Sequence, residues 1–469
     1  MSSKYMEEAK IKRETREIKE MCGFLQGREI LLLGFGAEGK STYNFIRRYF
    51  PDKTVAIADK KNLENEGLKN VVLYSDKNGK ECLDRYDAVI KSPGIVLDDS
   101  EKPYLDKITS QTELFLKYYA KQTIGITGTK GKSTTASLVR HVLAESEKDA
   151  LLVGNIGLPV FDVLERIRPE TWVVYELSSH QLEYVRHSPH IAVHLNIFEE
   201  HLDHYGTFDK YARAKENIFR YQQEGDILVY NREFIPGAPD SKAELITISN
   251  RYEDADGYIK NGKIHYKDTV LELNEEELKL KGQHNLYNIG VASIIARLCG
   301  ISEEQFVRAV RSFKPLPHRL EYVGEIDGVT YYNDSISTIC ETTIQGINSL
   351  KNVGTVLLGG MDRGIDYRPL AEYLLASDIE TVILMPDTGY RLLELLKELS
   401  GGEYGGKAIR MASGLEQAVE FALENPARGR ICLFSPAAAS YGFFRNFEDR
   451  GERFKKLLAE KSGLKTETL

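Results

Sequence analysis

The stretch that decides the fold is GITGTKGKSTTASLV, residues 125–139. The strict phosphate-binding pattern, G-x-x-x-x-G-K-[ST], requires a glycine five positions before Gly131, where this chain has isoleucine. Strand, glycine loop and helix still occur in the required order. Gly128 and Gly131 allow backbone amides to turn toward an anion, Lys132 supplies a positive charge, and the Ser133 hydroxyl suits magnesium. The sequence therefore predicts a nucleotide-binding loop that is one residue shorter than usual.

The bulk composition indicates a soluble protein of several domains. A chain of 469 residues suggests about three domains. Its net charge of -8 argues against nucleic acid as the main partner. No apolar run approaches the roughly 18 residues of a membrane span, and the charged N-terminus, MSSKYMEEAKIKRETREIKE, is unlike a signal peptide. The five scattered cysteines indicate reduced thiols, so we expect a cytoplasmic protein without a membrane span.

Strand signals alternate with helical stretches along most of the chain, which predicts parallel α/β architecture. The first domain is expected at 1–115. There the strand REILLLG runs into a G-x-G-x-x-G pattern that begins at Gly34, and Asp59 ends the next strand. This is the layout of a dinucleotide-type fold, although the glycines could also serve only a tight turn. Ser92 begins a second polar loop at the same edge.

The central domain is expected at 116–317. Its strand WVVYE ends in Glu176, and the next strand leads to His201 and Asp203. A carboxylate and an imidazole at the ends of neighbouring strands lie where α/β sheets bind ligands, but each alone would more often be a surface or core residue. Asn261 begins an Asn-Gly turn between alternating apolar residues, which predicts a tight hairpin. Two prolines in FKPLPHRLE suggest a linker.

The third domain is expected at 318–469, where the strands GTVLLGG, TVILMPD and RICLFSP alternate with helices. Three polar loops accompany these strands: NDSISTICETT, GGMDRGIDY and SPAAASYGFFRNFEDRG. Three α/β domains with polar edges imply a substrate that is assembled across a cleft, followed by a closing motion.

Nine ordered motifs resemble one known family across essentially the whole chain. They are GTKGKST, VGNIGLP, ELSSHQLE, EEHLDHYG, ARAKENIF, GQHNLYN, PHRLE, NDSIST and SPAAASYGFFRNFEDRG. Their order is that of the Mur ligases, the ATP-dependent amide-forming enzymes of peptidoglycan precursor synthesis, and the short loop is this family's own. The chain looks most like the members that add glutamate to UDP-N-acetylmuramoyl-L-alanine. The resemblance implies an N-terminal Rossmann-like UDP-binding domain, a central P-loop ATPase-like domain and a C-terminal Rossmann-like domain.

The resemblance also implies the chemistry. ATP would phosphorylate the alanine carboxylate, the amino group of glutamate would attack the acyl phosphate, and an amide and phosphate would form. The catalytic residues would be Lys132, His201 and Lys215. The ATP contacts would be Gly128, Thr129, Lys130, Gly131, Lys132, Ser133, Thr134, Asn288, Arg319 and Asp334.

Two magnesium ions accompany ATP in this family. By resemblance their ligands would be Ser133, Glu176, His201 and a carbamylated Lys215. An ordinary ammonium would repel magnesium, whereas a carbamate oxygen would bind it. Without the resemblance, Lys215 would be interpreted as a solvated helix lysine.

The same matching assigns the substrate contacts. The UDP-sugar would be held by Gly36, Asp59, Lys60, Ser92 and Asn155, so the first domain would bind no nicotinamide cofactor. The amino acid would meet Thr338, Arg363, Ser440 and Phe447, where a cation at 363 suits a dicarboxylic substrate. Only small molecules are expected as partners, and the chain is expected to be a monomer.

One position departs from the family. The usual N-D-S-K-x-T is N-D-S-I-S-T here, so Ile336 stands in place of a lysine, and Arg363 could replace part of the lost charge. A divergent branch that adds L-glutamate also lacks this lysine. D-glutamate is the favoured substrate, and an L-glutamate-adding Mur ligase stays open as an alternative. A folylpolyglutamate synthase-like ligase would not need the N-terminal domain. A non-catalytic nucleotide-binding or regulatory protein would not need Lys132, Glu176, His201, Lys215 and Arg319 together.

Overall fold

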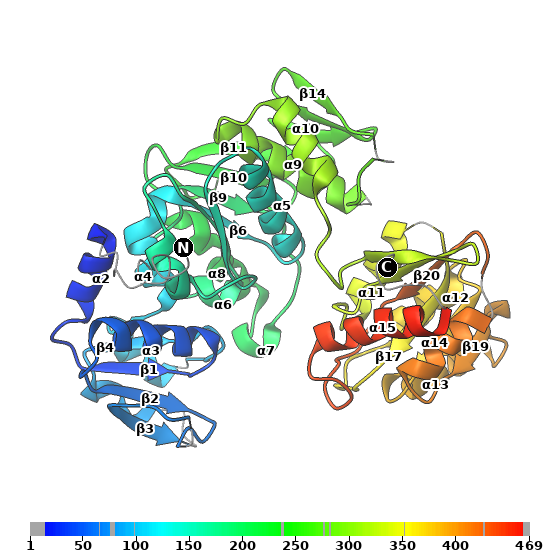
Figure 1. Cartoon of the computed structure of the whole chain (residues 1–469), viewed down its shortest axis with the longest axis horizontal. Coiled ribbons are helices and arrows are strands. Elements are labelled where there is room, and N and C mark those ends of the chain that lie inside the picture. The colour runs from blue at the N-terminus through cyan, green and yellow to red at the C-terminus, as the bar shows by residue number, and fades with distance from the viewer. Residues whose placement is uncertain are drawn as a thin grey trace, which may run out of the picture. The chain divides into compact units, whose positions relative to one another are not determined.

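The computed structural model describes residues 15–64, 66–75, 80–97, 99–235, 239–274, 277–280, 283–350, 352–424 and 427–462. The chain forms two compact units, Met1–Asn274 with Asn285–Ser312, and Glu275–His284 with Phe313–Leu469. The described residues form three β-sheets, and each predicted domain contains one of them (Figure 1). The predicted α/β fold class is therefore confirmed, while the domain limits stay predictions.

The first sheet is parallel throughout, in the order β3-β2-β1-β4-β5. Its strands are β1 (Ile30–Leu33), β2 (Val55–Asp59), β3 (Val71–Ser75), β4 (Ala88–Lys91) and β5 (Ile108–Thr109). The helices of this part are α2 (Arg16–Leu25), α3 (Ala37–Tyr49) and α4 (Gln111–Tyr119), with 3₁₀ turns η2 (Lys80–Arg85) and η3 (Asp99–Tyr104). The buried strands alternate with helices, as a doubly wound sheet requires.

The central sheet has the order β14-β13-β12-β11-β10-β9-β6-β8-β7. Its parallel strands are β6 (Thr123–Thr127), β7 (Ala150–Gly154), β8 (Trp172–Glu176), β9 (Ile191–His194), β10 (Ile227–Asn231) and β11 (Glu244–Ser249). β8 and β9 both pair with β6 and lie on either side of it. The sequence placed Glu176 and His201 at the ends of neighbouring strands. That prediction is wrong, because β6, the strand that leads into the glycine loop, lies between β8 and β9.

The predicted hairpin is present at the other end of this sheet. β12 (Gly257–Lys260) pairs antiparallel with β13 (Lys263–Tyr266), which pairs antiparallel with β14 (Thr269–Glu272). The helices of the central part are α5 (Lys132–Glu145), α6 (Ser179–Leu182), α7 (Leu202–Tyr205), α8 (Phe208–Arg220), α9 (Gln283–Leu298) and α10 (Glu303–Ser312), with 3₁₀ turns η4 (Ala120–Gln122) and η5 (Val160–Arg166).

A single apolar core extends from the first sheet to the central sheet. Phe45 of α3 packs against Phe161 of η5, with ring centroids 4.9 Å apart. Polar contacts flank this pair, since Ser41 Oγ donates a 2.7 Å hydrogen bond to Asp162 Oδ1. These contacts hold the first two sheets together within one compact unit.

The second unit contains the third sheet, in the order β15-β16-β20-β17-β18-β19. Its strands are β15 (Glu321–Ile326), β16 (Val329–Asn333), β17 (Val353–Gly359), β18 (Thr381–Met385), β19 (Ala408–Met411) and β20 (Ile431–Phe434), and only β15 runs antiparallel to its neighbour. The helices are α11 (Cys340–Leu350), α12 (Arg368–Ala376), α13 (Thr388–Ser400), α14 (Leu415–Glu424) and α15 (Phe447–Ser462), with the 3₁₀ turn η6 (Tyr404–Gly406). Two buried clusters pack on this sheet.

None of the five cysteines, all of which the structure describes, forms a disulfide. No helix among the described residues is long and apolar enough to cross a membrane.

Candidate active site

The glycine loop joins β6 to α5 and leaves the start of that helix open. Gly131 is the N-cap residue, with φ of 83°, and no side chain caps the helix. The first turn also contains no acidic residue, so its backbone amides keep their partial positive charge. Lys132 Nζ bends back and donates 2.9 Å hydrogen bonds to the carbonyls of Gly128 and Thr129. An open helix start beside a lysine is an anion-binding arrangement.

Side chains outside the loop fix its shape. Asn196 Oδ1 accepts hydrogen bonds from the amides of Thr129 and Lys130, and Asn196 Nδ2 donates to the Lys130 carbonyl. The predicted contact Asn288 is buried next to the loop, where a Cβ on Gly131 would lie 2.8 Å from Asn288 Oδ1. Asn196 was not predicted from the sequence, where its only signal is its place two residues after the end of β9.

Glu176 ends β8 at the same edge of the sheet, since it pairs with Ile126 two residues before the loop. Its side chain is fully buried. Oε1 accepts a 3.0 Å hydrogen bond from Asn155 Nδ2, while Oε2 has no hydrogen-bond partner in the part of the chain that the structure describes. A buried carboxylate oxygen without a partner is costly unless a cation or donor meets it.

Lys215 is not a solvated helix lysine. Although it lies on the charged helix α8, it is only 1% exposed. Nζ donates a 2.8 Å hydrogen bond to the Gly128 carbonyl, at the glycine loop. Burial, and then the charge of Lys132, hold the pKa of Lys215 well below its ordinary value. These surroundings favour a neutral amine, which is a nucleophile.

The ring of Tyr211 lies close to both Lys215 and His201. It lies 5.0 Å from Lys215 Nζ and 6.0 Å from the His201 ring, between centroids. His201 has a left-handed backbone, with φ of 58°. Its ring also lies 4.8 Å from that of His180, so several imidazoles gather here. The side chain of Asp203 lies outside the described part of the chain.

The donor types at this edge fit magnesium, which prefers oxygen ligands. Glu176 offers the partnerless oxygen, and Ser133 lies in the open first turn of α5. Within the described ranges no group of three or more His, Cys, Asp or Glu side chains has the arrangement of a metal site. The predicted set has only two residues of those types, Glu176 and His201, so it depends on the Ser133 hydroxyl and a modified Lys215 for the others.

At the first sheet, the glycine loop packs closely against its neighbours. Gly34 has φ of 94°, and a Cβ there would lie 2.8 Å from Ser92 Cβ. Ser92 Oγ donates to the Gly34 carbonyl, and Asp59 Oδ2 accepts a 2.7 Å hydrogen bond from the Phe35 amide. The Asp59 carboxylate thus already holds the loop, whereas in a nicotinamide-binding site it would face the ribose.

Gly36 and Lys60 are exposed at this edge. Glu38, two residues after Gly36 in the first turn of α3, was not predicted from the sequence. Its Oε1 accepts a 2.7 Å hydrogen bond from Gln181 Nε2, so the first sheet is linked to the segment that follows Glu176. Burial raises the pKa of the Glu38 carboxyl.

The second unit contains the other predicted nucleotide contacts, Arg319 and Asp334. Asp334 is 3% exposed, and its oxygens accept hydrogen bonds from the Leu320 amide and the Ser435 hydroxyl. Burial raises the pKa of the Asp334 carboxyl to about 6. Arg319 is half-buried, directly before Leu320. The structure thus brings these two residues together within their unit.

The predicted amino-acid contacts lie in loops that follow β16, β17 and β20. Arg363 Nη2 donates a 3.0 Å hydrogen bond to the Thr338 carbonyl. The cation at 363 therefore lies against the loop in which Ile336 replaces the usual lysine. Ser440 is buried, and Phe447 begins α15. Both belong to the same polar segment after β20.

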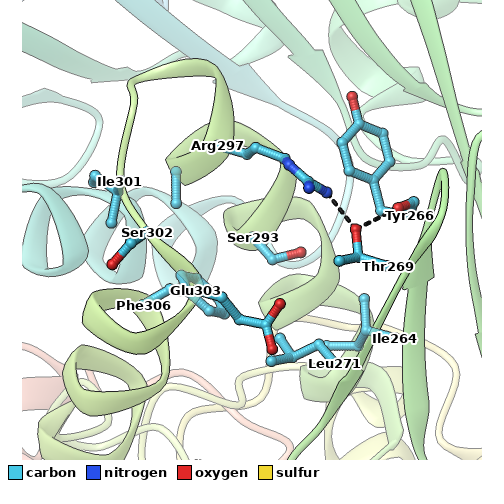
Figure 2. A pocket seen from close by; sticks show the side chains of 11 residues that line it. Ile264, Tyr266, Thr269, Leu271, Ser293, Arg297, Ile301, Ser302, Glu303 and Phe306 are labelled. Atoms are coloured by element: carbon cyan, nitrogen blue, oxygen red, sulfur yellow. Dashed lines mark hydrogen bonds between the residues drawn. The ribbon is translucent and has the colours of Figure 1, made fainter.

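A separate pocket of about 210 Å³ lies between β13, β14 and the helices α9 and α10 (Figure 2). Arg297 donates to the Thr269 hydroxyl, which donates to the Tyr266 carbonyl. None of the predicted site residues lines this pocket.

Comparisons with known proteins agree with this geometry. The model of the Mur ligase middle domain matches residues 126–296. A UDP-N-acetylmuramoylalanine--D-glutamate ligase of Koribacter versatilis is 32% identical over 92% of this chain and 98% of its own length. One of Geobacillus kaustophilus is 34% identical over 92% of this chain and 97% of its own length. The chain belongs to the Mur ligase family.

Solved Mur ligases share the fold. The UDP-N-acetylmuramate-alanine ligase MurC of Thermotoga maritima has 19% identity and a TM-score of 0.58, covering 92% of this chain and all of its own. The MurF ligase of the same organism, solved in complex with ADP, has 16% identity and a TM-score of 0.56, covering 96% of this chain and all of its own. In this Mur ligase, a glycine loop with an open helix start, a buried carboxylate and a buried lysine lie at one edge of the central sheet.

Proposed function

We propose that this Mur ligase adds glutamate, with D-glutamate favoured, to UDP-N-acetylmuramoyl-L-alanine in peptidoglycan precursor synthesis. The names of the relatives at 32% and 34% identity support this reaction. The single structural observation that carries it is the uncapped start of α5 beside Lys132, with the partnerless Glu176 oxygen at the same edge. We infer a cytoplasmic monomer whose partners are its small substrates.

The reaction joins two substrates in two steps. An oxygen of the alanine carboxylate attacks the γ-phosphorus of ATP, and ADP leaves. The uncharged amine of glutamate then attacks the acyl carbon, phosphate leaves with the carbon–oxygen electron pair, and the amide loses a proton. Lys132 and the first amides of α5 bind the phosphates and neutralise the charge that develops on them. We also assign Thr129, Lys130, Thr134 and Asn288 to ATP. Asn196 fixes the amides of Thr129 and Lys130, and Asn288 lies next to Gly131.

Magnesium, when bound, supplies positive charge to the phosphate oxygens. Ser133, Glu176, His201 and Lys215 would hold it, with Lys215 as a carbamate. The buried amine favours this modification, because a neutral nitrogen can attack carbon dioxide, forming an N–C bond and releasing one proton. The low pKa of Lys215 supports a neutral nitrogen.

In the second unit, we assign the glutamate carboxylates and backbone to Thr338, Arg363, Ser440 and Phe447, and nucleotide contacts to Arg319 and Asp334. Arg363 donates a hydrogen bond to the Thr338 carbonyl, in the loop where Ile336 replaces the usual lysine. This contact supports Arg363 as the cation that replaces part of the lost charge.

In the first unit, we assign the uridine and diphosphate to Gly36, Asp59, Lys60 and Ser92, and a further sugar contact to Asn155. Asp59 already accepts a hydrogen bond from the Phe35 amide, whereas in an NAD site its carboxylate would face the ribose. The site therefore suits a UDP-sugar better than NAD. Calorimetry with UDP-N-acetylmuramoyl-L-alanine and with NAD tests this assignment. We expect heat only from the UDP-sugar, and tight NAD binding without UDP-sugar binding would reverse it.

Phosphate release from ATP tests the whole proposal. The assay contains UDP-N-acetylmuramoyl-L-alanine and either D- or L-glutamate, and the product is then analysed for its stereochemistry. Release with D-glutamate alone is the expected result. Release with L-glutamate alone would move the chain to the L-glutamate-adding branch, and activity on a folate in place of the UDP-sugar would favour the folylpolyglutamate synthase-like alternative.

A further inference from the structure

Arg450 is a buried arginine of α15 that the proposed reaction does not yet use. It is 2% exposed. Nε donates a 3.0 Å hydrogen bond to Ser335 Oγ, Nη2 donates one of 2.7 Å to the Ser335 carbonyl, and Nη1 donates one of 2.9 Å to the Ala438 carbonyl. One guanidinium therefore donates hydrogen bonds to two loops that are far apart in the sequence, one at Ser335 and one at Ala438.

Both loops contain residues assigned to glutamate. Ser335 precedes Thr338 by three positions in the loop after β16, and Ala438 precedes Ser440 by two positions in the loop after β20. Ser335 Oγ in turn donates a 2.8 Å hydrogen bond to the Phe447 carbonyl. The positions of three assigned contacts therefore depend on one side chain.

The loop after β17, which carries Arg363, also lies close to this guanidinium. Gly360 has φ of 144°, and a Cβ there would lie 3.1 Å from Arg450 Nη1 and 2.6 Å from the Ala439 carbonyl. Glycine is required for this approach of the backbone.

The charge of Arg450 is not explained by stability alone. Among the described residues no carboxylate pairs with it, and its three acceptors are neutral. Burial without a counter-charge lowers the pKa of Arg450 to about 10. A buried charge of this kind usually stabilises a fold less than an apolar side chain of the same size. Arg450 and Ser440 also line one pocket of about 180 Å³ at the carboxyl ends of β17, β18 and β20.

We propose that Arg450 is the positioning residue of the glutamate site, where its fork of donors holds the loops of Thr338, Ser440 and Phe447 in the arrangement that accepts the amino acid. This inference rests on the proposed function. It predicts that substitutions of Arg450 affect glutamate selectively.

The test is the KM for each of the three substrates in Arg450→Met and Arg450→Lys. Displacement of the three loops is expected to raise the KM for glutamate by about tenfold or more in Arg450→Met. The KM for the UDP-sugar is expected to change less than about twofold, because all of its assigned contacts lie in the first unit. The KM for ATP is expected to rise less than that for glutamate, because only Asp334 among the assigned ATP contacts lies beside Ser335. Arg450→Lys keeps the positive charge but loses the fork of guanidinium donors, so its KM for glutamate is expected to lie between those of wild type and Arg450→Met.

Arg430→Met is the matched control. Arg430 lies in the same unit and donates to Asn352, Glu380 and the Val353 carbonyl, but it precedes β20 and so lies at the opposite end of that strand. Its removal is expected to lower stability and leave the KM for glutamate unchanged.

Ser335→Ala provides a second, milder variant if Arg450→Met does not fold. It removes the acceptor of Nε and the donor to Phe447, and about a fivefold rise in the KM for glutamate alone is expected. Equal changes in all three KM values, or a glutamate KM that matches the Arg430→Met control, would overturn the inference. An inactive wild type would instead contradict the proposed function.

Discussion

Asn155 Nδ2 donates a 3.0 Å hydrogen bond to Glu176 Oε1, and the Asn155 amide donates a second one, also 3.0 Å, to the Glu176 carbonyl. The neighbouring Gly154 lies so close that a Cβ there would be 2.3 Å from the same carbonyl. The ends of β7 and β8 are therefore locked together. Asn155 fixes which carboxylate oxygen is occupied and which one is available.

Asn155→Ala is expected to weaken magnesium binding as well as UDP-sugar binding. Without the amide, the Glu176 carboxylate loses its fixed orientation, and the loss of such a supporting contact typically lowers metal affinity by about tenfold or more. Titration of Mn²⁺ into the ADP-bound protein, followed by EPR, measures this directly. An unchanged Mn²⁺ affinity with a raised KM for the UDP-sugar would limit Asn155 to a substrate contact.

Lys132→Ala is expected to abolish turnover and leave the fold intact. Lys132 is only half-buried at the edge of the loop, where its amine donates to the carbonyls of Gly128 and Thr129, so its loss opens no core cavity. Phosphate release and the thermal unfolding midpoint are measured together. A folded variant with wild-type activity would reject the phosphate-binding assignment of the loop.

Lys215→Ala is expected to lose most activity, and a small carboxylic acid such as acetate is expected to restore part of it by filling the vacated oxygen site. Lys210→Ala is the matched control, because Lys210 lies on the same helix α8 but is exposed, and it should retain activity. ¹³C NMR of the wild type under ¹³CO₂ reports the carbamate independently of activity. Full activity of Lys215→Ala together with no carbamate signal would exclude the modification.

Asp334 is expected to make stability depend on pH in the direction opposite to a salt-bridged carboxylate. Burial raises the pKa of Asp334 from its ordinary value of 3.8 to about 6, so between these pH values the folded state holds a proton that the unfolded state has released. Stability therefore falls as pH rises from about 4 to about 6, by on the order of 3 kcal/mol in total. Asp334→Asn has no carboxyl to titrate at this position, so it lacks this contribution to the pH dependence of stability. Its stability relative to wild type should increase over that range and then level off, whereas a constant difference between pH 4 and 8 would contradict the buried, protonated carboxyl.

Much of the site could be predicted from the sequence because its motifs are local. The glycine loop, the strand that ends in Glu176 and the hairpin at Asn261 each depend on neighbouring residues, and all three are present. Lys215 is different. Helix α8 reads as a charged surface helix, and only its packing against β6 reveals that this lysine is buried.

The supporting residues could not be found in the same way. Asn196, Glu38 and Arg450 act through partners that are 66, 143 and 115 positions away. Such pairings depend on strand order, which places β6 between β8 and β9 and which no local pattern specifies. The role of Asp59 was likewise open, since the sequence cannot show that a backbone amide already occupies its carboxylate.

The apolar core that continues from the first sheet into the central sheet limits how enzymes of this architecture can exchange parts. A chimaera with a foreign N-terminal sheet must reproduce the face of α3 that meets η5, because a smaller residue than Phe45 would leave a void against Phe161. The boundary between Ser312 and Phe313 is different, since each described core cluster lies wholly on one side of it. Recombination at that second boundary keeps every described core whole, and recombination near residue 115 divides one.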